Sequence, residues 1–347
     1  MTNKVPFTGA GYLDVRELFP HILPYTWIWG GRGTGKTYGF LEYVRYTQPC
    51  KFLLLRRTQK QIDLLRKPMY NPFKAVDANH EGCYTAVARD GDTGLFYDAD
   101  LQDGRLAARG SPIGYALALS TVHNVRGLDL SDVDVVIYDE YIPEPHERPI
   151  RYEYEAFLNA METIGRNREL QGKRPVQFVG LSNANSLGNP YFLGLGVIRR
   201  VDKMLKSGTE IWADPGRGLM LINITASPIS QAKARTSLYK LAGDGEFSAM
   251  SLGNEFSMDV CSRRGTFPLG ELRPLVSVGE LCIYEHKRNK TLYCCDHHSG
   301  SPDRYNPDDT NLKRFRRDYG WLWTEYMDNN IVFQDILCEI LFNKYLT

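Results

Sequence analysis

The segment that constrains this chain most is a run of eight residues, Gly30-Gly31-Arg32-Gly33-Thr34-Gly35-Lys36-Thr37. It matches the pattern G-x-x-x-x-G-K-[ST] in full, directly after a strand-like run at 26–30 and at the start of a helical pattern over 37–46. Glycines let the backbone wrap an anion with its N–H groups pointing inward, and the helix N-terminus adds favourable dipole charge. The motif predicts a phosphate-binding loop for ATP, in which Lys36 reaches the β- and γ-phosphates and the Thr37 hydroxyl binds Mg²⁺. The alternative is a glycine-rich turn that carries a solvated lysine.

A pair of acidic residues, Asp139 and Glu140, follows a second apolar run at 133–138. A phosphate-loop enzyme needs a carboxylate at a strand end to hold Mg²⁺, and Asp139 fits that need. Glu140 is suited to orient and deprotonate an attacking water. Two strand-like runs, 51–57 and 115–120, precede the pair. Together with the second carboxylate, they favour the additional-strand branch of P-loop NTPases, which contains recombinases, helicases and DNA translocases.

Three further side chains are candidates for the same site. Asn183 follows a buried-type run at 176–181 and could sense the γ-phosphate or position the water, although Ser-Asn after a strand is more often a plain turn. Arg166 directly follows an amphipathic helical pattern over 151–164, where a guanidinium could reach the nucleotide of a neighbouring subunit. Arg32, inside the loop, is the rival arginine finger acting within one subunit. Either guanidinium could stabilise charge on the γ-phosphate oxygens in the transition state.

The order of patterns along the chain predicts an α/β fold with a mainly parallel sheet, followed by a smaller α+β domain. We expect three parts: an ATPase domain at 1–198, a polar linker or lid at 199–259 and a C-terminal domain at 260–347. The linker offers only a few amphipathic pieces, such as 232–241. The last domain is expected to end in a helix with a buried stripe that consists of Phe333, Ile336, Leu337, Ile340 and Leu341.

Composition excludes several classes of protein. The apolar runs are far shorter than the ~20 residues of a membrane-spanning helix, and the N-terminus lacks the apolar core of a secretory signal. Seven cysteines without a C-x-x-C pair favour free thiols in a reducing cytoplasm. The sequence Cys294-Cys295-Asp296-His297-His298 resembles a metal site, but neighbouring residues on a strand point to opposite faces, which argues against zinc.

Charge is nearly balanced, with 42 Lys and Arg against 41 Asp and Glu in 347 residues. A strongly basic chain would hold nucleic acid too tightly for a protein that moves along it, so balance does not exclude DNA as a partner. Short basic clusters could contact a phosphate backbone or form solvated faces; they are Arg56-Arg57, Arg199-Arg200, His286–Lys290 and Lys313–Arg317.

These motifs together resemble the DNA-encapsidation (genome-packaging) ATPases of small tailed podoviruses, which are distant relatives of large terminases. The resemblance includes the loop, the strand with Arg56-Arg57, the Asp-Glu segment and the Arg-Asn-Arg-Glu after the 151–164 helix. It also extends over Ser182-Asn183-Ala184, Asn189-Pro190-Tyr191-Phe192, the stretch 245–259 with Met250 and Asn254, and the terminal helix. It implies an ATP- and Mg²⁺-dependent motor that forms a homo-oligomeric ring, a pentamer in the family, on the portal of a procapsid in the host cytoplasm. Such a ring drives double-stranded DNA inward, without a membrane partner; whether a structural RNA takes part stays open.

The resemblance also assigns roles to individual residues. It places Arg166 at the position of the family's finger that acts in trans, and it supports Asn183 as a site residue. Gln59 stands where the trans-acting lid lysine of the family aligns, with Lys60 beside it.

For the C-terminal domain the resemblance implies an RNase H-like nuclease fold that has lost its acidic metal cluster. Glu285, Asp296 and Asp335 are the scattered acids of that region. A terminase-like large subunit with an active nuclease is the nearest alternative. A P-loop kinase of a small metabolite is a more distant one, because such a kinase would lack the Asp-Glu pair.

Overall fold

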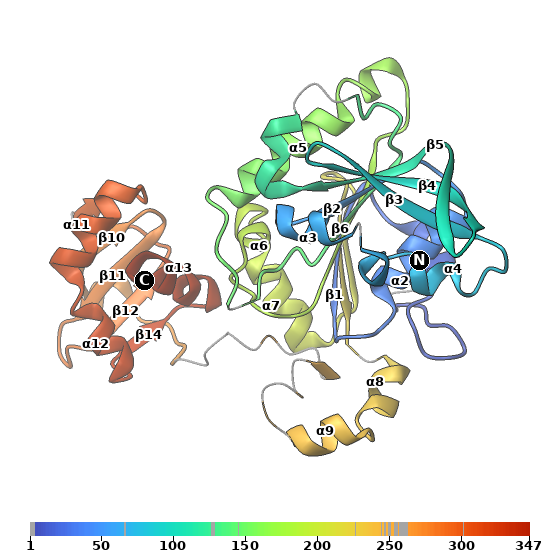
Figure 1. Cartoon of the computed structure of the whole chain (residues 1–347). Helices are drawn as coiled ribbons and strands as arrows, with labels where there is room; N and C mark the ends of the chain where they lie inside the picture. The colour runs from blue at the N-terminus through green and yellow to red at the C-terminus, as the bar shows by residue number, and fades with distance from the viewer. Residues whose placement is uncertain are drawn as a thin grey trace. The chain divides into compact units, whose positions relative to one another are not determined.

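The computed structural model describes the chain except residues 1–3, 66, 126–128, 145, 226, 244, 246, 247, 249, 250, 253–255, 257–262 and 301. The chain divides into two compact units (Figure 1). The first unit contains Met1–Gly194 and Met204–Met258, and the second contains Leu195–Lys203 and Asp259–Thr347.

The first unit contains a nine-stranded sheet with the order β3-β4-β5-β2-β6-β7-β1-β9-β8. Its strands are β1 (Tyr25–Gly30), β2 (Phe52–Arg56), β3 (Tyr84–Asp90), β4 (Thr93–Gln102), β5 (Arg105–Ala118), β6 (Val135–Asp139), β7 (Gln177–Ser182), β8 (Ile211–Asp214) and β9 (Leu219–Ile224). The six strands from β5 to β9 in this order are parallel, and β3, β4 and β8 pair antiparallel at the two edges. The predicted mainly parallel α/β sheet is therefore confirmed. Strand β7 lies between β1, which leads into the glycine loop, and β6, which ends at the Asp-Glu pair. The strand that separates these two therefore comes from a later part of the chain than 51–57 or 115–120.

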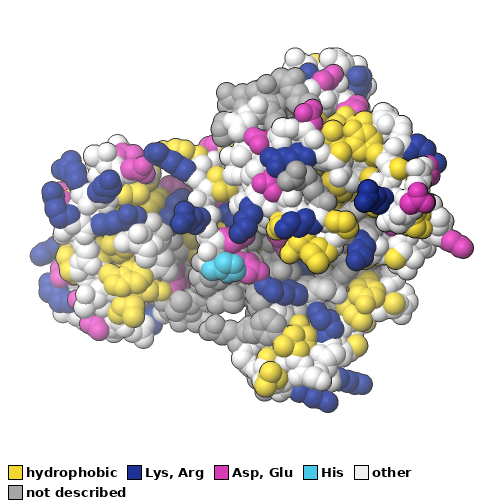
Figure 2. All heavy atoms as spheres, viewed as in Figure 1, with side chains coloured by type: hydrophobic (Ala, Val, Ile, Leu, Met, Phe, Trp, Pro, Cys, Tyr) yellow, Lys and Arg dark blue, Asp and Glu magenta, His cyan; other side chains and the backbone are white. Residues whose placement is uncertain are grey.

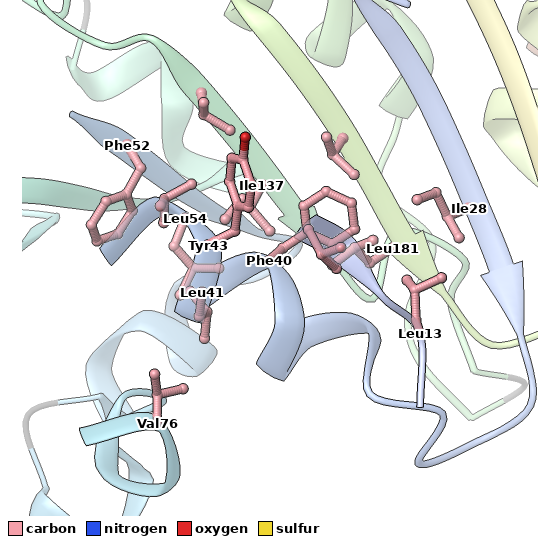
Figure 3. Close-up of a cluster of buried hydrophobic side chains, with 14 of the residues drawn as sticks. Leu13, Ile28, Phe40, Leu41, Tyr43, Phe52, Leu54, Val76, Ile137 and Leu181 are labelled. Carbon is pink, nitrogen blue, oxygen red and sulfur yellow. The ribbon is translucent and has the colours of Figure 1, made fainter. Parts of the chain in front are cut away.

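Helices pack on both faces of this sheet. The helices of the first unit are α1 (Val15–Leu18), α2 (Lys36–Glu42), α3 (Gln59–Leu64), α4 (Lys74–Asp77), α5 (Glu153–Gly165), α6 (Pro190–Gly194), α8 (Pro228–Lys233) and α9 (Ser237–Ala242), and α7 (Ile198–Ser207) crosses the boundary between the two units. Neighbouring residues of a strand face opposite sides, and β1 shows this clearly. Ile28 joins the cluster around Phe40 of α2 (Figure 3), whereas the ring of Trp27 lies 5.2 Å from that of Phe157 in α5 and 5.0 Å from that of Tyr191 in α6.

The region 199–259 differs from the polar linker that the sequence suggested. Strand β9 lies beside β1 with Tyr25 opposite Leu219, and all its residues are buried. Five of its six residues are apolar, with Asn223 as the exception. Such a run is typical of a strand buried on both faces, which shows no alternation to mark it. The expected amphipathic piece at 232–241 is two short helices, α8 and α9, because Thr236 adopts an extended conformation between them.

The second unit is an α+β fold, as predicted. Its sheet has the order β13-β10-β11-β12-β14, with β10, β11 and β12 antiparallel, β13 parallel to β10 and β14 parallel to β12. Its elements are β10 (Leu272–Val278), β11 (Leu281–His286), β12 (Leu292–Cys295), β13 (Asp303–Tyr305), α11 (Asp309–Tyr319), α12 (Leu322–Met327), β14 (Ile331–Phe333) and α13 (Ile336–Leu346).

The terminal helix begins later than the sequence suggested. Phe333 belongs to β14, and the Asp335 side chain caps α13 by accepting a hydrogen bond from the Cys338 amide. Of the expected stripe on α13, Ile336 and Leu341 are buried, and the other two residues are half-buried. Among the helices that the structure describes, none is long and apolar enough to cross a membrane.

Candidate active site

The glycine loop connects the end of β1 to the start of α2, as the motif predicts. Gly33 and Gly35 have φ angles of 68° and 86°, which residues with a side chain rarely adopt. A Cβ atom on Gly30 would lie 2.7 Å from Ile224, and one on Gly31 would lie 2.5 Å from the carbonyl oxygen of Ser251. Glycine is therefore required at these positions by backbone conformation or by close packing.

The loop lines an open pocket of ≈ 390 Å³ at the edge of the sheet where the parallel strands end. Most of the residues predicted for the site meet there, together with Glu144. The lining consists of Arg32, Gly33, Thr34, Gly35, Lys36, Thr37, Tyr38, Asp139, Glu140, Glu144, Ser182 and Asn183. The carboxyl ends of β1, β6 and β7 supply these side chains, because parallel strands end at one edge of the sheet.

Lys36 is buried and folded back onto its own loop. Its Nζ donates to the carbonyl oxygens of Gly30 at 3.0 Å and Gly31 at 2.8 Å, and lies 3.5 Å from Oδ1 of Asn183. Burial lowers the pKa of Lys36 to about 7; the charge of Asp139 opposes this effect, and the charges of Lys233 and Arg32 add to it. Burial thus disfavours the charged form of Lys36, and an anion bound at the loop would stabilise it.

The two carboxylates after β6 have different partners. Asp139 accepts a hydrogen bond from the Thr37 hydroxyl at 2.8 Å, so the two predicted metal ligands lie side by side. Arg56, at the end of β2, contacts Oδ2 of Asp139 and Oε2 of Glu140, each at 2.8 Å. Partial desolvation raises the pKa of Glu140, although its side chain is 56% exposed, and the Arg56 guanidinium opposes the increase. Glu140 also has a φ of 60°, which turns the chain sharply after the strand.

Arg56 and Arg57 therefore do not form the exposed basic cluster that the sequence suggested. Arg57 is fully buried, and its guanidinium contacts Glu153 on α5 at 2.8 and 3.0 Å and Glu147 at 2.6 Å. Successive residues at a strand end point in opposite directions, so Arg56 reaches the two carboxylates and Arg57 reaches the core.

The two candidate arginine fingers lie in different places. Arg32 is in the pocket lining, where its Nη2 contacts Oε1 of Glu144 at 2.5 Å. Arg166 ends α5 outside that lining, and its Nη1 lies 3.4 Å from Oδ1 of Asp129. Its backbone has φ 41° and ψ −154°, a conformation that favours glycine.

Two contacts to the loop come from parts of the chain that carried no sequence signal. Lys233, at the end of α8, donates a hydrogen bond to the Arg32 carbonyl. Tyr12 packs on the loop from the N-terminal side, since a Cβ on Gly35 would lie 3.0 Å from Cβ of Tyr12. Neither residue belongs to a recognisable motif, and only the fold brings them to the loop.

Acidic and basic side chains of the second unit pair with each other. Arg199 contacts Asp296 and Asp335 at 2.6 Å each, and Lys290 contacts Glu285 at 3.1 Å. The three scattered acids of the sequence thus have arginine or lysine partners. Nowhere in the described part of the chain do three or more His, Cys, Asp or Glu side chains form a group that could hold a metal.

The fold and the site together define a class: an α/β protein with a mainly parallel sheet, whose strand ends carry a glycine loop and a pair of carboxylates. Within that class, the chain belongs to the podovirus DNA encapsidation protein (Gp16) family, whose model matches residues 12–263. The segment 245–259, which supported the resemblance, falls within this match, although Met250 and Asn254 lie outside the described residues.

Curated relatives agree with this assignment. The chain is 29% identical over 239 residues to the DNA packaging proteins of Bacillus phages PZA and phi29; the alignment covers 66% of this chain and 61% of each relative. It is 27% identical over 237 residues to the DNA packaging protein of Bacillus phage B103. The matched stretch is thus less than two thirds of these relatives' length.

Two solved structures share the fold over nearly the whole chain. One is described as the Phi-28 gp11 DNA packaging motor, with a TM-score of 0.62, 17% identity and coverage of 97% of this chain and 98% of that one. The other is the bacteriophage Phi-29 viral genome packaging motor assembly, with a TM-score of 0.64, 18% identity and coverage of 96% and 99%. At these identities the likeness concerns the fold.

Proposed function

We propose that this chain is an ATP-driven translocase that packages double-stranded DNA of a virus into a procapsid. The observation that carries the proposal is the 2.8 Å contact between Thr37, at the end of the glycine loop, and Asp139, at the end of β6. A loop that wraps phosphates and a hydroxyl-carboxylate pair beside it form the minimal apparatus for Mg-ATP. The family and the names of its packaging relatives support DNA as the track.

The donor set fits Mg²⁺, because the Thr37 hydroxyl and the Asp139 carboxylate are hard oxygen ligands. Bound with the nucleotide, the metal would neutralise charge on the phosphate oxygens. Lys36 would exchange the carbonyl oxygens of Gly30 and Gly31 for phosphate oxygens, which are stronger acceptors for an ammonium. Arg56 would have to give up Asp139 when that carboxylate turns to a metal.

Glu140 is the proposed general base for the attacking water. Its contact with Arg56 holds the carboxylate in a defined position, and partial desolvation raises its pKa, which is the direction that suits a general base. Asn183 lies beside the Lys36 ammonium and is placed to sense the γ-phosphate. The position of β7 between β1 and β6 supports membership of the additional-strand branch of P-loop NTPases.

A homo-oligomeric ring, a pentamer by resemblance, completes the proposal. Within one chain, Arg166 does not line the pocket, which is compatible with a finger that acts on the neighbouring subunit. Arg32 does line it but is paired with Glu144. The portal is the proposed docking partner, with a structural RNA as an optional one, in the cytoplasm of the host.

For the domains, we propose that residues 1–198 together with β8 and β9 act as the ATPase motor, and that the α8–α9 segment acts as its lid. The second unit is proposed to be RNase H-like without nuclease activity. Arg199 bridges Asp296 and Asp335, so these carboxylates are neutralised by a side chain and offer no charge for a metal. The second unit therefore does not support the alternative of a terminase-like subunit with an active nuclease.

The test is ATP hydrolysis by the purified full chain, with and without double-stranded DNA. We expect DNA to stimulate hydrolysis, Glu140→Gln to bind ATP without turnover, and Glu155→Gln to behave as wild type, since Glu155 is exposed on α5. Normal turnover by Glu140→Gln would refute its role as the base, and wild-type protein that neither binds nor hydrolyses ATP would refute the function.

Sharing of sites is tested by mixing two inactive variants. Lys36→Ala lacks the loop lysine and Arg166→Ala lacks the proposed finger. Activity in the mixture, absent from each variant alone, is expected if Arg166 acts in trans. A mixture without activity would favour Arg32 as a finger in cis, or no finger.

A further inference from the structure

The turn at Arg32 and Gly33 is attached on both sides to a segment far along the chain. The Arg32 amide donates to the Ser251 carbonyl at 3.2 Å, and the Arg32 carbonyl accepts from Nζ of Lys233. Segment 227–233 is also fixed to the N-terminal stretch, because the Ser227 hydroxyl donates to the Gly11 carbonyl at 2.7 Å. Both backbone polar groups of Arg32 are therefore held by residues far along the chain, the N–H by Ser251 and the carbonyl by Lys233.

The ammonium of Lys233 lies directly on the loop. A Cβ on Gly33 would be 2.9 Å from Nζ of Lys233, so the side chain fills the space that the glycine leaves. The ammonium also lies 5.6 Å from the centroid of the Tyr239 ring. Within the part of the chain that the structure describes, no carboxylate forms an ion pair with Lys233. A backbone carbonyl and an aromatic face are weak partners for a half-buried cation.

Lys233 is thus held in the same way as Lys36. Lys36 donates to the carbonyls of Gly30 and Gly31, and Lys233 donates to the next carbonyl, that of Arg32. The two ammonium groups are therefore held on adjacent carbonyls of the same turn. Three consecutive carbonyls of one loop therefore hold two lysines that repel each other, and an anion of high charge density at the loop would relieve that repulsion.

We propose that Lys233 is a second lysine of the nucleotide site. Its ammonium responds to the negative charge of the bound polyphosphate, and through it the α8–α9 segment is coupled to the nucleotide. This inference rests on the function proposed above. In this structure the ammonium fixes the Arg32–Gly33 turn. With a triphosphate in the loop, the phosphate oxygens outcompete the Arg32 carbonyl, and α8 follows its terminal residue. Lys233 is a positioning residue for the loop and a sensor of the nucleotide, with no proton-transfer role.

The experiment compares ATP and ADP affinities of the full chain, with wild type, Lys233→Met, Lys233→Arg and Lys240→Met as a matched control. Lys240 lies on α9 and is exposed. A hydrogen bond to a charged group contributes enough for about a tenfold loss of ATP affinity in Lys233→Met, with a smaller loss for ADP. Lys233→Arg should recover most of the loss, and Lys240→Met should match wild type. An unchanged ATP affinity in Lys233→Met, or equal losses for ATP and ADP, would overturn the proposal.

Amide hydrogen exchange of wild-type protein over residues 227–243 provides a second measurement that needs no variant. ATP should change the exchange of this segment, and AMP should leave it as in the free protein. Exchange that is the same with and without ATP would overturn the coupling to α8–α9. Failure of the proposed function looks different, because wild-type protein would then bind neither nucleotide, whatever residue stands at 233.

Discussion

Replacing Glu153 with alanine should destabilise the first unit, because it removes a carboxylate partner from the buried guanidinium of Arg57. The side chains of Arg57 and Glu153 are 0% and 1% exposed, and two hydrogen bonds of 2.8 and 3.0 Å join them. Burial alone lowers the pKa of Arg57, but the hydrogen bond to Glu153 and the charges of Glu153 and Glu147 together raise it by more, so the guanidinium stays charged. Tyr191 also donates to Glu153 at 3.0 Å, so the variant removes one acceptor from a buried hydroxyl as well as one from a buried cation.

The structure sets the size of the effect. Removing one member of a buried ion pair costs about 3–5 kcal/mol. Glu147, 26% exposed, still contacts Arg57 at 2.6 Å, so we expect the lower end of the range, about 3 kcal/mol. For a unit of this size, that corresponds to a fall in Tm of roughly 6–12 °C.

Urea denaturation followed by tryptophan fluorescence measures the loss, because Trp27 is fully buried and its ring lies 5.2 Å from that of Phe157 on α5. Glu155→Ala, exposed on the same helix, is the control and should stay within about 0.5 kcal/mol of wild type. The double variant Arg57→Met/Glu153→Met should regain most of the stability, to within about 1 kcal/mol. If Glu153→Ala matches the control, or the double variant is as unstable as the single one, the reasoning from an uncompensated charge is wrong.

Two further predictions concern the pocket, and one concerns the second unit. Lys36, with a pKa of about 7, must take up a proton to hold phosphate, so ATP affinity should fall by about tenfold per pH unit above pH 7, and calorimetry in buffers of different ionisation enthalpy should detect the uptake. Arg56→Met removes the charge that opposes the raised pKa of Glu140, so the acid limb of the pH–rate profile should move to higher pH; an unmoved limb would argue against Glu140 as the base. Arg199→Ala should cost only about 1 kcal/mol, less at high salt, because its aspartate partners are partly exposed; a loss several times larger in a melting experiment would contradict this.

The sequence predicted those parts of the structure in which the local backbone geometry requires a particular type of residue. The loop at Gly30–Thr37 needs glycines for its backbone, and Asp139 must stand at a strand end, so both were visible in the sequence and the structure places them side by side. Strand β9 was missed, since a short apolar run without alternation carries no period that separates it from a linker.

Contacts over long sequence separations could not be predicted in the same way. Arg56-Arg57 has the composition of an exposed basic cluster, and charged residues are almost never fully buried unless they are paired. Only the arrangement of β2, β6 and α5 shows that one arginine faces the carboxylates and the other faces Glu153. Lys233 lies some two hundred positions after Arg32, and nothing in the local pattern of α8 distinguishes it from a solvated lysine.

Glu140 and Arg166 have positive φ angles, so the side chains proposed for activity stand at positions where they lower the stability of the protein. Each residue carries a Cβ in a backbone conformation that glycine adopts freely, at a cost of about 1 kcal/mol or more. A laboratory selection for thermal stability alone would therefore favour glycine at both positions. The selected protein would be more stable but would lack the proposed general base and arginine finger. The same two positions offer a rapid check on any derived sequence, because glycine at both would mark a descendant that keeps the fold and has given up the chemistry.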